Sequence, residues 1–482
     1  MRTPLLLLCS LLPAAEWPQF RGPAAAGVGD AARIPADIGP ESANLVWKTA
    51  LPPGHSSPVV HGNRIFLTAA EGGKDSDAGR DKVIDEGGKL FTLALDRANG
   101  RVLWRKEAPR PRQERFQPTG SPASPTPVTD GRSVYVFFGD FGLIAYTAEG
   151  AERWRLPLGP FNNVNGHGSS PILAEGKVIL VCDQDTDSYL LAVDQNTGKI
   201  AWKTDRSEYT RSYTTPAYFK PAKGPSELIV SGSYELAGYQ VQTGEKLWWV
   251  RGQSWQPKSV PIIQDGIIYS HSWEGGGEAE TPTETPTFDE VVKRYDKNGD
   301  RLLTPEELAP MIPNPRAVIN SDLGNDGALD ERDWNNYRAR RASRNRLVAV
   351  RHGGRGDLTN SNVIWSMQKF LPNCPTPLLY NGVLYLIKDG GIMTAVNPKT
   401  GEILKQGRLT GAIGTYSASP VAGGGRVLFL SEPGEAAVVK AGADWELMAV
   451  NKFDDPIYAT PALVENRIYL RTKSALYCFR AE

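Results

Sequence analysis

The side chains best suited to chemistry lie in one polar stretch of the 482-residue chain. In residues 296–307, oxygen ligands stand at loop positions 1, 3, 5, 7 and 12, which are Asp296, Asn298, Asp300, Leu302 (through its carbonyl) and Glu307. Calcium prefers such a set of carboxylate, amide and carbonyl oxygens. The spacing therefore predicts a calcium loop, although Arg301 occupies position 6, where the sharp turn favours glycine.

A second copy of the pattern follows at residues 322–333. Its oxygen ligands are Asp322, Asp326, Ala328 (through its carbonyl) and Asp333. Gly324 offers no side-chain ligand at position 3 and Asp333 is shorter than the usual Glu, so we expect weaker binding here. Leu303 and Leu329 share position 8, where paired EF-hands form a short two-stranded contact. Residues 284–345 thus resemble an EF-hand pair, the alternative being a solvated acidic linker.

Most of the chain repeats one unit of four short strands, best seen in residues 170–202. Each unit opens on a proline, and these are Pro58, Pro127, Pro171, Pro216, Pro261, Pro377, Pro420 and Pro461. The interval is about 40 to 45 residues, apart from two longer gaps that hold insertions at 71–88 and 284–345. This period predicts an all-β fold, an eight-bladed β-propeller of four-stranded antiparallel blades, with the helical EF-hand insertion in the fifth blade.

The two ends of the repeat array complement each other. The last unit stops after three strands, whereas residues 45–49 read as a fourth strand with nothing before it, so we expect them to close the ring. The outer strands also carry bulky side chains that we expect to wedge between blades, namely Trp47, Trp104, Trp154, Trp202, Trp248, Trp365 and Trp445, with Leu404 in the remaining unit.

Two repeats, LALDRANGRVLW at 93–104 and LAVDQNTGKIAW at 191–202, resemble the motif of pyrroloquinoline-quinone-like propeller repeats. The segment WPQFRGP at 17–23 is similar to the start of exported bacterial members of that family. The resemblance covers the chain outside the two insertions and implies the eight-bladed fold. It implies function only loosely, because such repeats serve both quinoprotein dehydrogenases and non-catalytic assembly proteins.

Composition limits the compartment and the partners. Residues 1–15 have one positive charge, a leucine run and a small-residue end, which predict a signal peptide and export to the periplasm or medium. Residues 16–44 then form an N-terminal arm. Fifty-four basic residues balance 54 acidic ones, so we expect no nucleic-acid partner, and the Arg-rich run 338–346 is interpreted as a solvated helix face. No other stretch is long and apolar enough to span a membrane, and we expect a monomer.

Four cysteines fit neither a disulfide framework nor a zinc site. We expect Cys182, Cys374 and Cys478 to be buried thiols at strand positions. The polar insertion 71–88 is predicted to be a mobile surface loop.

Loops that enter the innermost strands surround one mouth of a propeller channel. The candidate ligand-binding residues on these loops are His55, His167, Arg211, Tyr213, Trp255, Lys258, Asn373, Tyr416 and Tyr458. The alternative interpretation is that they are polar loop tips that only hydrogen-bond the crowded loops. Because both insertions lie between second and third strands, we expect them on this same face, with the calcium module covering or bordering the mouth.

Three functions remain open. The favoured hypothesis is a non-enzymatic, exported calcium-binding propeller that binds a small molecule or a protein at its mouth. The second is a dehydrogenase that uses pyrroloquinoline quinone and calcium, which is disfavoured because the family's adjacent cysteine pair is missing. The third is a scaffold for outer-membrane protein assembly. We name no catalytic residues, calcium is the expected cofactor, and the quinone is not favoured.

Overall fold

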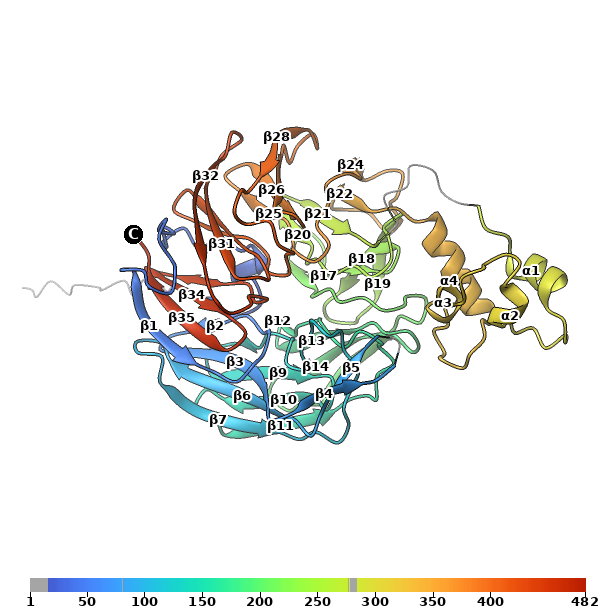
Figure 1. Ribbon diagram of the computed structural model, residues 1–482, viewed down its shortest axis with the longest axis horizontal. Helices are drawn as coiled ribbons and strands as arrows, with labels where there is room; N and C mark the ends of the chain where they lie inside the picture. The colour runs from blue at the N-terminus through green and yellow to red at the C-terminus, as the bar shows by residue number, and fades with distance from the viewer. Residues whose placement is uncertain (1–15, 80, 276, 278–283) are drawn as a thin grey trace, which may run out of the picture.

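The computed structural model describes residues 16–79, 81–275, 277 and 284–482. Within these residues, eight sheets stand around a central channel like the blades of a propeller (Figure 1). The predicted eight-bladed, all-β fold is therefore confirmed. The predicted signal peptide and Cys9 lie outside the described residues.

Blades are numbered here by their innermost strands. Blade 1 holds β2 (Val59–His61), β3 (Arg64–Glu71), β6 (Lys89–Asp96) and β7 (Val102–Ala108). Blade 2 holds β8 (Val128–Thr129), β9 (Ser133–Phe138), β10 (Gly142–Thr147) and β11 (Glu152–Pro157). Blade 3 holds β12 (Ile172–Ala174), β13 (Lys177–Cys182), β14 (Tyr189–Asp194) and β15 (Ile200–Asp205). Blade 4 holds β16 (Ala217–Phe219), β17 (Glu227–Gly232), β18 (Glu235–Gln240) and β19 (Lys246–Arg251).

The second half of the ring repeats this order. Blade 5 holds β20 (Ile262–Gln264), β21 (Ile267–Ser272), β22 (Arg346–Arg351) and β24 (Val363–Met367). Blade 6 holds β25 (Leu378–Tyr380), β26 (Val383–Lys388), β27 (Ile392–Val396) and β28 (Ile403–Arg408). Blade 7 holds β29 (Val421–Gly423), β30 (Arg426–Leu430), β31 (Glu435–Lys440) and β32 (Glu446–Lys452). A short extra strand, β23 (Gly356–Asp357), leaves blade 5 and pairs in parallel with β19 of blade 4.

Blade 8 joins the two ends of the chain. It consists of β33 (Ala462–Val464), β34 (Arg467–Arg471), β35 (Ala475–Arg480) and, from the N-terminal side, β1 (Leu45–Ala50). β1 pairs antiparallel with β35, with Trp47 opposite Cys478. The expected closure of the ring by the N-terminal strand is confirmed.

A ring of hydroxyl groups ties the blades together at the channel. The backbone N–H that precedes an opening proline donates to the Ser or Thr hydroxyl at the same position of the next blade, at 2.9 to 3.0 Å. Among the described residues these pairs are Ser57 to Thr126, Thr126 to Ser170, Ser170 to Thr215, Val260 to Thr376, Thr376 to Ser419, Ser419 to Thr460 and Thr460 to Ser57. Val260 has no hydroxyl, so the ring is interrupted between blades 4 and 5.

Tryptophans fasten the outer edges of several blades. Each covers a glycine of the next blade and donates its indole N–H to a carbonyl there, and the residues that do so are Trp47, Trp104, Trp154, Trp202 and Trp365. The other three positions differ. Trp248 donates to Glu227 of its own blade at 2.7 Å and packs in the core between blades 4 and 5. Trp445 precedes β32 and packs in the core between blades 6 and 7, with Lys405 over its ring. The expectation for Leu404 was wrong: it is 43% exposed, and Lys405, opposite Ala395, holds the position that tryptophan has in other blades.

The arm at 16–44 crosses the channel at the end opposite the mouth. Trp17 pairs with Val60 of blade 1, and Val28 pairs with Ala422 of blade 7. Between them lies the short 3-10 helix η1 (Pro23–Ala25) and the fully buried Arg21, whose guanidinium donates to carbonyls of Ala25 and Pro377. Burial without a carboxylate partner lowers the pKa of Arg21 to about 9. The arm therefore forms the floor of the channel.

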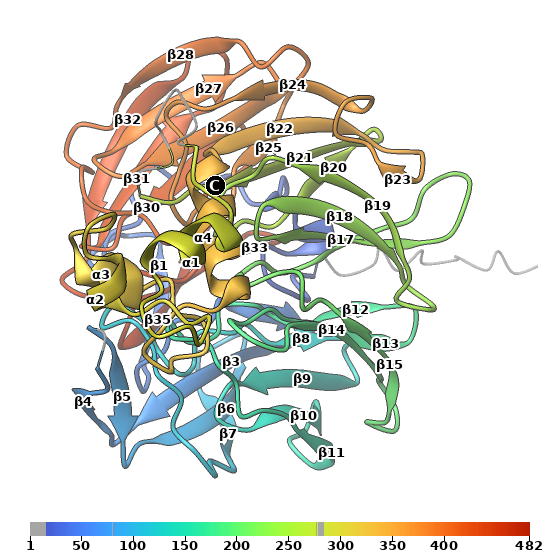
Figure 2. The ribbon, with the colours of Figure 1, turned by 90° about the vertical axis from the view of Figure 1, so that its right-hand side faces the viewer.

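The insertion after β21 folds as a small helical unit at one side of the ring (Figures 1 and 2). It comprises α1 (Phe288–Tyr295), α2 (Pro305–Leu308), α3 (Pro315–Ile319) and α4 (Glu331–Ala342). Thr287, Thr304 and Asp330 form capping boxes that fix the starts of α1, α2 and α4. The helices enclose their own core, which includes Phe288 and Trp334.

The first insertion is not the mobile loop that we expected. It forms the hairpin β4 (Lys74–Asp77) and β5 (Val83–Glu86), which lies against the loop at Phe116 through a bridge from Val83. Arg110 anchors it by ion pairs of 2.6 Å to Asp85 and to Asp140 of blade 2. In the described part of the chain, no helix is long and apolar enough to cross a membrane.

Candidate functional site

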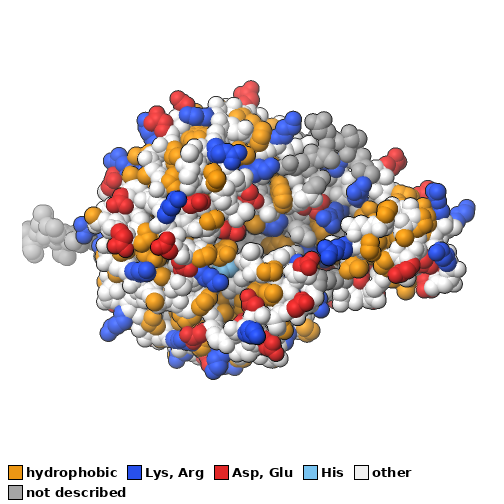
Figure 3. Space-filling view, viewed as in Figure 1, with side chains coloured by type: hydrophobic (Ala, Val, Ile, Leu, Met, Phe, Trp, Pro, Cys, Tyr) orange, Lys and Arg blue, Asp and Glu red, His pale blue; other side chains and the backbone are white. Residues whose placement is uncertain are grey.

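A chamber of about 320 Å³ lies in the channel just below the mouth. Phe20 of the arm forms part of its lower wall, and the hydroxyls of the ring line its sides. The space-filling view shows the corresponding hollow at the centre of the propeller (Figure 3). Because most of the lining is hydroxyl, amide and aromatic, the chamber offers many hydrogen-bond donors and acceptors but little charge.

Five of the nine candidate mouth residues line this chamber: His55, His167, Tyr213, Lys258 and Tyr458. The ring of His55 stacks on Tyr458 with centroids 4.0 Å apart. His167 packs edge-on against Phe161 at 4.3 Å. Burial lowers the pKa of both histidines to about 3, so both rings are neutral at physiological pH. Burial also lowers the pKa of Lys258, which donates to the carbonyl of Gln256 at 3.3 Å.

Two of the nine candidates, Tyr416 and Asn373, line neither this chamber nor the smaller cavity described below. Tyr416 is 1% exposed and belongs to the core between blades 6 and 7, where its hydroxyl donates to the Ala412 carbonyl. Asn373 is also absent from the lining, which its neighbour Cys374 joins instead. The residue three positions before each opening proline lines the chamber, whereas Tyr416 and Asn373 stand four positions before theirs.

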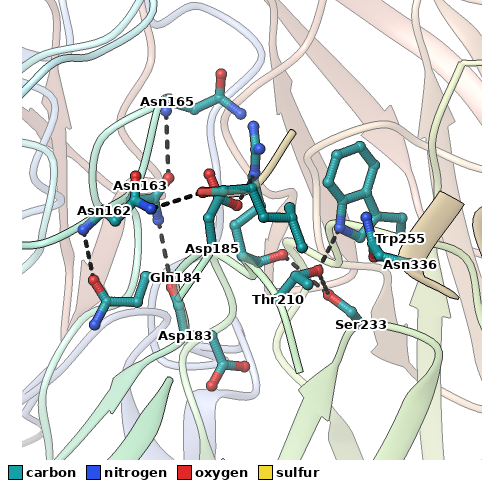
Figure 4. Close-up of polar contacts among 12 residues, drawn as sticks. Asn162, Asn163, Asn165, Asp183, Gln184, Asp185, Thr210, Ser233, Trp255 and Asn336 are labelled. Atoms are coloured by element: carbon teal, nitrogen blue, oxygen red, sulfur yellow. Dashed lines mark hydrogen bonds and ion pairs between the residues drawn. The ribbon is translucent and has the colours of Figure 1, made fainter. Parts of the chain in front are cut away.

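The remaining two candidates, Arg211 and Trp255, line a separate cavity of about 200 Å³. Arg211 is ion-paired with Asp185. Trp255 donates its indole N–H to Thr210 at 2.6 Å, and Thr210 in turn contacts the hydroxyl of Ser233. These groups lie together on the loops of blades 3 and 4 (Figure 4).

A polar network supports the loop that ends at His167. Asn165 donates to the Tyr213 hydroxyl at 2.5 Å, and that hydroxyl lies 3.3 Å from Asn163. The backbone N–H of Asn165 donates to the Asn163 side chain at 3.3 Å (Figure 4). Below it, the buried Arg206 forms a two-pronged ion pair with Asp183 at 2.7 and 2.8 Å, and Ser212 donates to the same carboxylate. The mouth loops of blades 3 and 4 are therefore held by side chains as well as by backbone.

Several lining residues were missed from the sequence. Gln117, Asn165 and Gln256 line both cavities, and Phe20 and Cys374 line the chamber. Cys374 is a half-buried loop residue, not the buried strand thiol that we expected, whereas Cys182 and Cys478 are buried. Burial raises the pKa of Cys374, which keeps the thiol protonated. The hydroxyl ring could have been predicted from the sequence, because a Ser or Thr precedes nearly every opening proline.

The two loops that were predicted to bind calcium pair with each other through their backbones. Leu303 and Leu329 exchange backbone hydrogen bonds of 3.0 and 2.9 Å, the contact expected from their shared position. In the first loop Arg301 takes a left-handed φ of 61°, and its side chain pairs with Asp289 at 2.8 Å.

The predicted ligand side chains accept backbone N–H groups of their own loops. The first loop uses Asp296, Asn298, Asp300 and Glu307 in this way, while the Leu302 carbonyl takes no part in that set. The second loop uses Asp322, Asp326 and Asp333, and Ala328 donates its N–H to Asp326. Within the described ranges, no group of three or more His, Cys, Asp or Glu side chains is already arranged around a metal position. The oxygen donors nevertheless fit a hard cation by type and by order along the loop.

The helical unit touches the mouth directly, on the face predicted from strand counting. The Asn162 side chain donates to the carbonyl of Leu323 at 2.8 Å, and Leu323 N–H donates to Asp333, the last position of the second loop. From α4, Asn336 accepts from the Tyr234 hydroxyl at 2.7 Å. The second of the two predicted loops is thus joined to the mouth loops by a direct hydrogen bond.

The sequence matches the family described as "Outer membrane protein assembly factor BamB" over residues 86–251 and 219–482. The chain belongs to this family of pyrroloquinoline-quinone-like propeller repeats. A comparison with curated proteins gives no match.

Solved structures show the same fold at low identity. BamB from Moraxella catarrhalis aligns with a TM-score of 0.53 and 12% identity over 90% of this chain and 98% of that one. The quinohemoprotein alcohol dehydrogenase ADHIIG from Pseudomonas putida HK5 aligns with a TM-score of 0.57 and 11% identity, over 97% and 80%. A europium-containing methanol dehydrogenase aligns with a TM-score of 0.55 and 11% identity, over 97% and 98%.

Two aromatic groups of the mouth offer no open ring face to a quinone cofactor of the kind that the sequence resemblance implies. A flat aromatic cofactor needs an open ring face on which to stack. Arg211 and Arg340 lie on the Trp255 ring at 4.9 and 4.5 Å, and His55 already stacks on Tyr458. Lys258 is the only cationic residue among the described chamber lining. We therefore derive no step through this group.

Proposed function

We propose that this chain is an exported, calcium-binding propeller that binds the uncharged, hydroxyl-bearing part of a small molecule in the mouth chamber and does no chemistry on it. The observation that carries the proposal is the chamber itself, in which hydroxyls, amides and aromatic rings from most blades converge on one space of about 320 Å³. Saccharides and polyols present matching hydroxyls and apolar C–H faces.

The histidines and the cysteine of the chamber support binding without catalysis. His55 and His167 have pKa values of about 3, so they are weak bases at neutral pH. The raised pKa of Cys374 leaves little thiolate to act as a nucleophile. Neutral groups of this kind suit the recognition of hydroxyl groups.

We expect Thr119→Trp to weaken saccharide binding roughly tenfold or more, because the indole would fill the chamber from an exposed position without disturbing the core. Isothermal titration calorimetry with glucose, maltose, trehalose and myo-inositol measures this. Ala222→Trp, on an exposed loop after β16, is the matched control and should bind as the unmodified protein does.

Two results would count against this proposal. One is that none of the four probes binds saturably to the unmodified protein. The other is that protein incubated with pyrroloquinoline quinone and calcium oxidises an alcohol with a dye as electron acceptor, which would support the dehydrogenase alternative.

We further propose that calcium occupies the two loops and orders the helical unit beside the mouth. The support is the donor set, the Leu303–Leu329 pairing and the Asn162–Leu323 hydrogen bond. Calcium then influences the mouth by ordering the helical unit beside it, without contacting the bound molecule itself.

We expect Asp296→Ala and Glu307→Gln each to weaken calcium binding roughly tenfold or more, and Asp322→Ala to do so less, because the second loop has fewer side-chain ligands. Calorimetry measures the affinities, and hydrogen exchange of residues 160–168 with and without calcium reports the coupling. Glu306→Gln, an exposed neighbour at a non-ligand position, is the control. Equal losses in both loops, or calcium-independent exchange at 160–168, would contradict this scheme.

A further inference from the structure

The cavity of about 200 Å³ beside the chamber is built where three separate parts of the chain meet. The hairpin of the first insertion contributes Lys82, the helical unit contributes Asn320 and Arg340, and the mouth loops contribute Arg211 and Trp255. Neither insertion alone would create this space. The cavity therefore exists only because both insertions are present.

The charge of this lining is one-sided. Lys82, Arg211 and Arg340 are cations, and among the described residues that line the cavity there is no carboxylate. The acids that neutralise the two arginines lie outside the lining, since Asp185 pairs with Arg211, and Glu274 pairs with Arg340 at 3.0 Å. The cationic sides of these pairs thus face the cavity.

The arrangement also brings like charges close together. Both guanidiniums lie on the Trp255 indole, at 4.9 and 4.5 Å from its ring, and the Trp255 side chain is 2% exposed. Burial, opposed by Asp81 and reinforced by the charge of Arg211, lowers the pKa of Lys82. Arg211 is 4% exposed, and its Nη2 atom is buried without a hydrogen-bond partner. An anion placed here would relieve the repulsion and could approach an unused donor.

We propose that this cavity binds an oxyanion group, a carboxylate or a phosphate or sulfate ester. The cavity shares Gln117, Asn165 and Gln256 with the mouth chamber, so the two are adjacent. If the proposed function holds, the oxyanion belongs to the same molecule as the hydroxyl-bearing part, which makes the ligand an acidic sugar or sugar ester. The oxyanion site itself does not depend on that function.

Binding of inorganic phosphate, measured by calorimetry at constant ionic strength in chloride, tests the site directly. We expect one saturable equivalent, and a loss of affinity of about tenfold or more in Arg340→Gln and in Lys82→Gln, because each removes one charged donor from a different insertion. Arg341→Gln is the matched control. It is the next residue of α4, is exposed and carries the same charge, so its affinity should stay within about twofold.

Glucose, glucuronate and glucose 6-phosphate then separate the sources of the oxyanion. Preferential binding of glucuronate or of glucose 6-phosphate over glucose, lost in Arg340→Gln but not in Arg341→Gln, supports a carboxylate or a phosphate ligand respectively. Absence of saturable phosphate binding, or equal losses in the Arg340 and Arg341 variants, would overturn the oxyanion site. Binding of phosphate without binding of any sugar would keep the oxyanion site and contradict the proposed function instead.

Discussion

A chain that begins at residue 51 is expected to lose roughly 5 kcal/mol or more of its free energy of unfolding. Removing β1 exposes the edge of β35 and takes away Trp47, which covers Gly100 of blade 1 and donates to the Arg97 carbonyl. The arm that forms the channel floor is lost with it. Denaturant unfolding followed by circular dichroism measures the change.

Two further variants divide this loss between its causes. Trp47→Ala alone should cost about 3 kcal/mol, since the strand and the arm remain. A chain lacking only residues 1–15 is the control and should unfold as the complete chain does. Ring closure would not be the source of stability if the chain that begins at residue 51 melted at the same temperature as this control.

We expect Asp183→Ala to destabilise the protein by roughly 3 to 5 kcal/mol, because it leaves the guanidinium of Arg206 buried without its carboxylate. Both side chains are about 1% exposed, so water cannot replace the lost partner. The same substitution frees Ser212, which should loosen the mouth loop of blade 4. Urea unfolding measures the stability, and hydrogen exchange of residues 206–214 measures the loop.

Glu208→Ala is the control for this variant. Glu208 forms an exposed ion pair with Lys246 at 2.6 Å, and pairs of that kind contribute only about 0 to 1 kcal/mol. A similar, small effect of both substitutions would show that the buried pair is not needed for stability.

The fold was predictable from the sequence because its determinants are local and repeated. A proline at the start of each unit, turn residues between the strands and a regular interval specify the blade, and the incomplete last unit specifies ring closure. The shared position of Leu303 and Leu329 in the two predicted calcium loops likewise indicated their contact.

The site was predictable only where it repeats with the blades. His55 and His167 were found because they precede equivalent prolines, whereas Phe20 enters the chamber from the arm and has no counterpart in other units. The small cavity depends on where two insertions meet in space, and no spacing in the sequence gives that. Leu404 was misassigned because the residue at the equivalent position, four after Gly401, is Lys405, which does not resemble the tryptophans of the other repeats.

Blades 4 and 5 are joined differently from the other blades that the structure describes. Val260 interrupts the hydroxyl ring, and Trp248 makes no glycine contact of the kind that joins other outer strands. Instead, Trp248 packs in the core shared by the two blades, with its ring 6.4 Å from that of His352, and His352 contacts Glu227 of blade 4 at 3.0 Å. At the outer edge β23 pairs with β19, and near the axis the Thr214 hydroxyl donates to the Ser259 carbonyl at 2.7 Å. This junction is therefore held by contacts of its own, so a substitution there would act on blade 5, which carries the helical unit, and leave the repeated contacts of the other blades in place.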